Sequence, residues 1–131
     1  MKLVVLGATG GTGLEIVRRA VEQGHTVTAF VRSTGRLESF RDRIAIRQGD
    51  LLDHDELGEA IKGHDGVLSG FGPRLPIVKA DEDLLHRFGV ALTTAMRCAG
   101  VRRVVVESTA FLFRDSIVPP TYLFGRLFCR A

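Results

Sequence analysis

Short apolar runs rich in β-branched residues alternate along this chain with stretches of helical periodicity, and this alternation limits the possible folds more than any other feature. Runs of this kind occupy residues 2–6, 26–31, 44–48, 66–68 and 103–106. They suit strands that are buried on both faces. Strands that alternate with helices predict a parallel sheet with right-handed crossovers. We therefore expect a Rossmann-like, doubly wound α/β fold with the strand order 3-2-1-4-5.

The ends of the helices are marked by capping residues. Asp53 followed by Glu56 has the spacing of a capping box and predicts the start of one helix. A residue at or near Asp81 opens a longer helix. Polar residues 32–38 predict a loop or a first helical turn. Glycine ends helices because it adopts the left-handed conformation, so the predicted helix ends are Gly24, Gly63 and Gly100.

Composition narrows the class of protein. The chain has 131 residues, a net charge of +3 and 45% hydrophobic residues, so it can bury a core as one domain over residues 1–131. The charges are scattered and no apolar run approaches the ~18 residues of a membrane span, so we expect neither a nucleic-acid nor a membrane partner. Cys98 and Cys129 form no CxxC motif, which favours a reduced, cytoplasmic setting. The histidines have no metal-ligand spacing, so we expect no metal.

A glycine-rich loop lies between the first strand and the first helix. Residues 7–13 read GATGGTG, which is a GxxGxxG spacing. Such a loop lets the backbone approach a pyrophosphate closely, and the helix that follows offers unpaired N–H groups to it. A merely structural turn is the alternative interpretation. The predicted phosphate-binding residues are Gly7, Thr9, Gly10, Gly11, Thr12 and Gly13.

The end of the second strand indicates which dinucleotide is bound. An acidic residue there would bind the 2′-hydroxyl of NAD. This chain has Arg32 and Ser33 instead, with Arg36 further along. A guanidinium can pair with a 2′-phosphate and stack on adenine. The sequence favours NADP(H) over NAD, although ordinary loop arginines would give the same pattern.

These motifs together resemble a known family. In order, the chain contains MKLVVLGATGGTG, TVTAFVRS, RQGDLLD, GHDGVLSGFG and VRRVVVEST. This combination resembles the atypical short-chain dehydrogenase/reductases, and most closely their NmrA-like and flavin reductase (biliverdin reductase B-like) NAD(P)H-binding members. The resemblance covers nearly the whole chain.

The resemblance implies roles for residues that follow the later strands. It places Asp50 and Leu51 beside the adenine, although Asp50 could instead serve the start of a helix. It places the segment Ser69, Gly70, Phe71 and Gly72 beside the cofactor ribose. It places Ser108 and Thr109 in the active site near the nicotinamide, although Ser108 could be a turn residue at the end of a strand.

The catalytic tyrosine of the family would correspond to Tyr122. Classical members pair the serine with a Tyr-x-x-x-Lys motif, and here Tyr122 is followed four residues later by Arg126. A packing role for Tyr122 is therefore the stronger interpretation. The flavin-reductase-like members do not depend on this tyrosine, so the resemblance implies an NADPH-dependent reductase of a flavin, quinone or similar planar acceptor. The alternatives are a non-catalytic, NmrA-like redox sensor and a truncated remnant.

The C-terminal residues depart most from the family. The resemblance implies that the part supplying the last strands and much of the substrate pocket is absent. Residues 111–131 hold five of the nine aromatic side chains and predict an irregular apolar tail. An apolar tail and an uncovered fifth strand could both lead to association. We expect that a homodimer would form through one of them.

Overall fold

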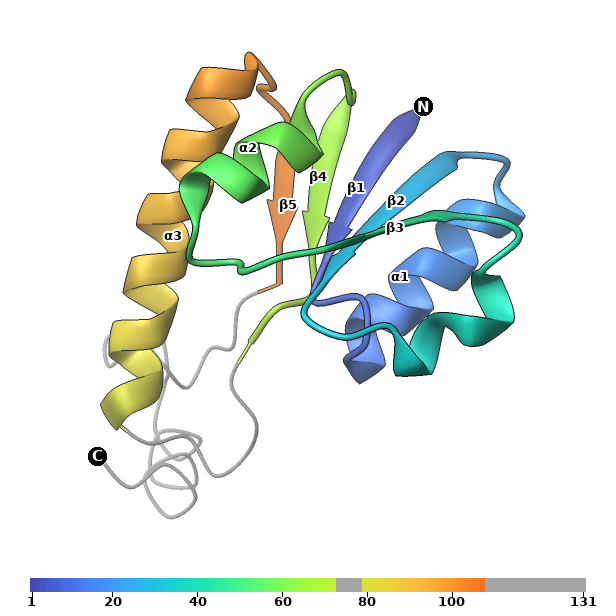
Figure 1. Cartoon of the computed structure of the whole chain (residues 1–131), viewed down its shortest axis with the longest axis horizontal. Helices are drawn as coiled ribbons and strands as arrows, with labels where there is room; N and C mark the ends of the chain where they lie inside the picture. The colour runs from blue at the N-terminus through green and yellow to red at the C-terminus, as the bar shows by residue number, and fades with distance from the viewer. Residues whose placement is uncertain (73–78, 108–131) are drawn as a thin grey trace, which may run out of the picture.

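A computed structural model describes residues 1–72 and 79–107, with backbone alone for 79–82. These residues form a parallel sheet with helices on both faces (Figure 1). The strand order is β3-β2-β1-β4-β5, which confirms the predicted fold. The elements are β1 (Lys2–Leu6), α1 (Gly11–Glu22), β2 (Thr26–Val31), the 3-10 helix η1 (Gly35–Phe40), β3 (Ala45–Gln48), α2 (His54–Ile61), β4 (Gly66–Ser69), α3 (Lys79–Ala99) and β5 (Val104–Val106).

The central strand β1 is buried on both faces of the sheet, which is why it is apolar from Leu3 to Leu6. α1 and η1 lie on one face, and α2 and α3 lie on the other (Figure 1). Successive residues of β1 serve opposite faces: Val5 packs in the α1-side core, whereas Val4 and Leu6 pack in the α3-side core. All three side chains are fully buried. Each such burial stabilises the fold by about 1.5–3 kcal/mol.

The strand order creates a switch point between β1 and β4. The chain runs outward from β1 to β3 and then returns to β4 on the other side of β1. Leu6 of β1 is level with Ser69 of β4, so the loops after these two strands begin side by side. Open parallel sheets bind ligands at this place, outside the carboxyl ends of the strands.

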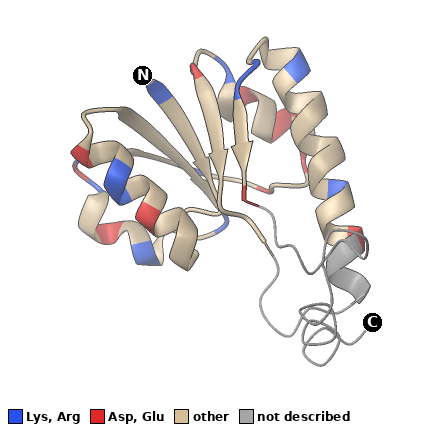
Figure 2. Cartoon of the chain, turned by 180° about the vertical axis from the view of Figure 1, so that it is seen from behind, with Lys and Arg blue, Asp and Glu red and all other residues tan. Residues whose placement is uncertain are grey.

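The helix ends agree with the sequence prediction. Left-handed backbone follows α1, α2 and α3 at Gly24, Gly63 and Gly100. α3 begins at Lys79, two residues before the predicted start. No helix in the described ranges is long and apolar enough to cross a membrane. Figure 2 shows Lys and Arg interspersed with Asp and Glu over these elements, in keeping with the scattered charge of the sequence.

Four local details differ from the prediction. β4 ends at Ser69 rather than Leu68, and β5 begins at Val104 rather than Arg103. β3 begins at Ala45 rather than Ile44, because the Ile44 N–H donates to Phe40 O (3.1 Å) and so continues the preceding turn. The segment after β2 contains a 3-10 helix, η1, that extends past the predicted loop. These differences move no strand in the sheet.

The cap of α2 is formed in part as predicted. Asp53 Oδ1 accepts hydrogen bonds from the N–H groups of Asp55 (2.9 Å) and Glu56 (3.1 Å). The Glu56 carboxylate does not return to Asp53, as a capping box requires. It accepts from the N–H of Asp50 (2.9 Å), because the Asp53 N–H already donates to Asp50 O (3.1 Å).

Candidate functional site

Three glycines bring the backbones of two loops and a helix into direct contact at the switch point. A Cβ on Gly13 would lie 2.0 Å from Gly7 O, and one on Gly70 would lie 2.8 Å from Gly13 N. A Cβ on Gly7 would lie 2.7 Å from Phe71 N. Gly7 also has a φ of +67°, which side chains rarely adopt. Only glycine fits these positions without moving backbone, so the spacing read from the sequence has a steric cause here.

The N-terminus of α1 is open. Its N-cap is Gly10, no side chain caps it within the described residues, and its first turn carries no acid. The first hydrogen bond of the helix runs from Leu14 N to Gly10 O (2.9 Å). The N–H groups before Leu14, in the first turn, therefore have no intrahelical partner. Among the residues that the structure describes, a Cβ on Gly11 would meet nothing within 4 Å.

The N-terminus of α2 can be compared with that of α1 in the same chain. There Asp53 caps two N–H groups, and Asp55 and Glu56 add negative charge to the first turn. That terminus is therefore satisfied by its own side chains and repels anions. α1 has the opposite arrangement, since its N–H groups and the positive end of its dipole are available to an anion.

Arg36 lies beside the glycine loop. Its Nη1 donates to Thr9 O over 2.9 Å, across 27 residues of sequence. Arg32 and Ser33 follow β2 and are exposed. The Arg32 carbonyl accepts from Gln48 Nε2 (3.4 Å), which links the ends of β2 and β3. The three predicted residues therefore gather beside the loop, on the side of β2.

Asp50 and Leu51 have different environments. Asp50 is exposed, and its Oδ1 accepts from the N–H of Leu52 (2.9 Å). Leu51 is buried and its side chain packs in the α3-side core. Of this pair, Asp50 alone presents its side chain to solvent, at the end of β3.

The segment after β4 contributes backbone rather than polar side chains. Ser69 is buried, and its Oγ accepts from the N–H of Phe71 (3.3 Å). The Phe71 ring packs on Phe88 of α3, with 4.7 Å between centroids. Gly72 is exposed. Phe71 therefore fixes the path of this loop against α3 while its backbone touches Gly7.

Glu107 joins the site, and the sequence analysis did not single it out. It follows β5, and its Oε1 accepts from the Thr12 hydroxyl (3.3 Å) at a sequence separation of 95. Its position at the carboxyl end of a predicted strand was the available signal. The contact places a carboxylate at the start of α1, on the Thr12 side-chain hydroxyl rather than on the N–H groups of the first turn.

The remaining predicted residues, Ser108, Thr109 and Tyr122, lie outside the described residues, as does the segment 111–131. Within the described ranges no group of His, Cys, Asp and Glu side chains is arranged to hold a metal ion.

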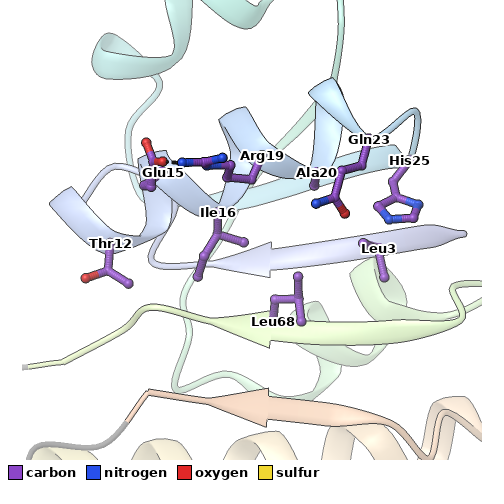
Figure 3. Close-up of a pocket in the computed structure, with 9 residues that line it drawn as sticks. All are labelled: Leu3, Thr12, Glu15, Ile16, Arg19, Ala20, Gln23, His25 and Leu68. Atoms are coloured by element: carbon purple, nitrogen blue, oxygen red, sulfur yellow. Dashed lines mark hydrogen bonds and ion pairs between the residues drawn. The ribbon is translucent and has the colours of Figure 1, made fainter.

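A hollow of about 460 Å³ runs along α1 on the face that looks toward β4 (Figure 3). Its apolar lining comes from Leu3, Ile16, Ala20 and Leu68. Thr12 lies at one end, and Gln23 and His25 lie at the other (Figure 3). The hollow therefore follows the sheet face and reaches the first turn of α1 at Thr12.

The pKa of one carboxyl near this hollow is strongly shifted. Hydrogen bonds from Arg18 and Arg19 lower the pKa of Glu15 to about 2. Arg18 also pairs with Glu22, so three consecutive turns of α1 are linked on its outer side. This network stabilises the helix that carries the open N-terminus.

The arrangement fits the diphosphate of a dinucleotide. Open N–H groups, the absence of an acid in the first turn of α1 and three close-packed glycines match what a pyrophosphate requires. The carboxyl ends of β2 and β3 extend this surface toward Arg32, Arg36 and Asp50.

Comparisons with known proteins agree with this geometry. Residues 7–124 match the family model described as NAD(P)H-binding. The chain is 33% identical over 116 residues to the uncharacterized protein YwnB of Bacillus subtilis, covering 88% of this chain and 51% of that protein. It is 36% identical over 80 residues to an isoflavone reductase homolog of Zea mays, covering 54% of this chain and 26% of that protein.

Solved structures share the fold. A nucleoside-diphosphate-sugar epimerase from Pseudomonas aeruginosa matches with a TM-score of 0.69 and 26% identity, over 85% of this chain and 34% of that one. The chain spans about half the length of the Bacillus relative and a smaller share of the others. The match to the family model extends from the glycine loop through the fifth strand and beyond. The ligand of a domain of this family is a nicotinamide dinucleotide. The chain belongs to the NAD(P)H-binding family and has a Rossmann-like fold.

Proposed function

We propose that the chain is an NADPH-dependent reductase that passes hydride to a flavin, quinone or similar planar acceptor. The observation that carries the proposal is the open N-terminus of α1, which is cradled by glycines and has Arg36 bonded to the same loop. The acceptor class comes from the resemblance to flavin-reductase-like proteins. The printed name of the maize relative also supports a reductase.

In this proposal each strand end holds one part of the cofactor. The N–H groups of Gly11, Thr12 and Gly13 bind the diphosphate, and Asp50 lies toward the adenine. The backbone of residues 69–72 lies along the ribose, and Ser108 and Thr109 lie near the nicotinamide. Bound NADPH supplies the hydride. The chain's own residues orient the cofactor and exclude water from it, and Tyr122 stays a prediction.

Two features support NADPH over NADH. The end of β2 has Arg32 and Ser33 where an acid would select the free 2′-hydroxyl. The Arg36 guanidinium is already held at the loop by Thr9 O, so less freedom is lost when it meets a phosphate. A guanidinium also pairs with phosphate through two parallel hydrogen bonds.

The cofactor preference is tested by nucleotide titration of Arg32→Ala and Arg36→Ala. We expect each variant to bind NADPH about tenfold more weakly, which is about 1.4 kcal/mol, and to bind NADH as the wild type does. Arg97→Ala is the matched control, because Arg97 is an exposed arginine in the last turn of α3. Equal losses for NADPH and NADH would contradict the proposed 2′-phosphate contact.

The acceptor is tested by following NADPH oxidation with flavins and quinones. Turnover with a planar acceptor supports the reductase. Tight NADPH binding with no turnover across the panel would instead favour the second candidate, a dinucleotide-binding module that senses redox state. That candidate is consistent with a site built mainly from backbone groups.

A further inference from the structure

The turn between β3 and α2 is held by several hydrogen bonds. The Gly49 N–H donates to Val31 O (3.0 Å), and the Asp53 N–H donates to Asp50 O (3.1 Å). The Leu52 N–H donates to Asp50 Oδ1 (2.9 Å), which is an Asx turn. These bonds define the path of the turn, and they direct one oxygen of the Asp50 carboxylate back to its own chain.

Glu56 adds a bond to this turn from the first turn of α2. Its Oε2 accepts from the Asp50 N–H (2.9 Å). A Cβ on Gly49 would lie 2.8 Å from Glu56 Oε2 and 2.5 Å from the ring of Phe30. The Glu56 carboxylate therefore lies against Gly49, in a place that a side chain at residue 49 would fill.

Two groups of the turn have no partner among the residues that the structure describes. The Leu51 N–H donates to none of them, and Asp50 Oδ2 accepts from none of them. The Asp50 side chain is exposed. A donor and an acceptor on adjacent residues are thus left for water or a ligand at the carboxyl end of β3.

The edge of adenine is complementary to this pair. Its exocyclic amino group donates and a neighbouring ring nitrogen accepts. Hypoxanthine has a carbonyl in place of the amino group, so it would set an acceptor against the Asp50 carboxylate. A correctly oriented Asp50 therefore favours adenine over hypoxanthine, because the wrong base leaves the carboxylate unpaired.

We propose that Glu56 is a positioning residue for the adenine end of the cofactor. By holding the Asp50 N–H, it fixes the peptide plane between Gly49 and Asp50, and with it the direction of the Asp50 carboxylate. Without this bond the plane can rotate, since glycine offers little resistance to rotation. The inference rests on the proposed function, because it concerns the adenine of the same bound NADPH.

Titration with NADPH and with its hypoxanthine analogue tests the inference. We expect the wild type to bind NADPH about tenfold more tightly than the analogue, the effect of one hydrogen bond to a charged group. Glu56→Ala should lower this ratio to about twofold, through a loss of NADPH affinity alone. A purely structural role of Glu56 would weaken both nucleotides equally and leave the ratio unchanged.

Two conservative variants separate the reach of the side chain from its charge. Glu56→Gln keeps an oxygen at the same distance along the side chain and should retain the wild-type ratio. Glu56→Asp keeps the charge but is one methylene shorter, so it should behave as Glu56→Ala does. If Glu56 acted only through its charge on the helix dipole, the order of these two variants would be reversed.

Asp55→Ala is the matched control for the loss of a carboxylate. Asp55 is an exposed acid in the same first turn of α2, and its carboxylate lies 3.5 Å from His54 Nε2 rather than on the turn before the helix. It should keep the wild-type ratio. Urea midpoints close to that of the wild type show that each variant is folded.

The inference is overturned if Glu56→Ala or Glu56→Asp keeps the wild-type ratio, or if the wild type binds the two nucleotides equally. In each of these cases NADPH still binds, so the proposed diphosphate site at α1 stands. A folded wild type that binds neither nucleotide overturns the proposed function and this inference together.

Discussion

Gly13→Ala is the substitution for which the structure predicts the largest effect from a single methyl group. The new Cβ would lie 2.0 Å from Gly7 O, 2.6 Å from Gly7 C and 2.8 Å from the Cα of Ala8. All three atoms belong to backbone, so no side chain can rotate away. To reach an ordinary contact of 3.4 Å, α1 must move away from the loop by more than 1 Å.

The energetic cost follows from two opposing effects. Overpacking of this kind costs about 1–3 kcal/mol, and replacing glycine by alanine within a helix returns about 0.5–1 kcal/mol. Because the clash is with backbone, we expect a net loss of about 2 kcal/mol in the free energy of unfolding. For a chain of this size this lowers the Tm by roughly 8 °C.

Urea unfolding and nucleotide titration measure the two consequences of Gly13→Ala. The urea midpoint should fall, and NADPH affinity should drop at least tenfold, because the N–H groups of α1 move with the helix. Gly89→Ala is the matched control, since Gly89 is an exposed residue of α3 and its new Cβ would meet nothing within 4 Å. The Gly89→Ala variant should have a free energy of unfolding about 0.5–1 kcal/mol higher than that of the wild type. If Gly13→Ala and Gly89→Ala behave alike, the steric account of the glycine loop is wrong.

The other predictions concern the helices α2 and α1. Asp53→Ala should lower the free energy of unfolding in urea by about 1 kcal/mol, because it removes the acceptor for two N–H groups. Asp55→Ala is the control and should lower it by less. Equal losses in the two variants would contradict the role of Asp53 as the cap. Glu15→Gln should be less stable than the wild type at pH 7, because hydrogen bonds from Arg18 and Arg19 lower the pKa of Glu15 from 4.5 to about 2. Because the pKa of Glu15 is lowered in the folded state, its ionised form stabilises the fold above pH 4.5, and this stability is lost as the pH falls through 2. The Tm values of Glu15→Gln and the wild type should therefore converge near pH 2. A difference in Tm that does not change with pH would refute this origin.

The sequence predicts the sheet well because each strand follows from local signals. The apolar runs, the caps and the helix-ending glycines are all read over a few residues, and the strand order is one of the usual orders of the doubly wound fold that these signals predict. The boundary of β3 and the course of η1 depend on hydrogen bonds such as Ile44 N to Phe40 O, which no local pattern specifies.

The site is only partly local. The glycine loop can be recognised by its spacing, yet the reason for Gly13 lies in its contact with the backbone of Gly7, which only the packed structure reveals. Glu107 reaches Thr12 across 95 residues. The burial of Leu51 and Ser69 likewise depends on how α3 covers the sheet, so sequence alone assigns them to the site without saying how they serve it.

A calorimetric titration of the purified chain with NADPH, and with NADH as the comparison, tests the central claim most directly. We expect one NADPH to bind per chain with a micromolar Kd, and NADH to bind more weakly. A folded sample that binds neither nucleotide would contradict the assignment of the α1 N-terminus as the diphosphate site.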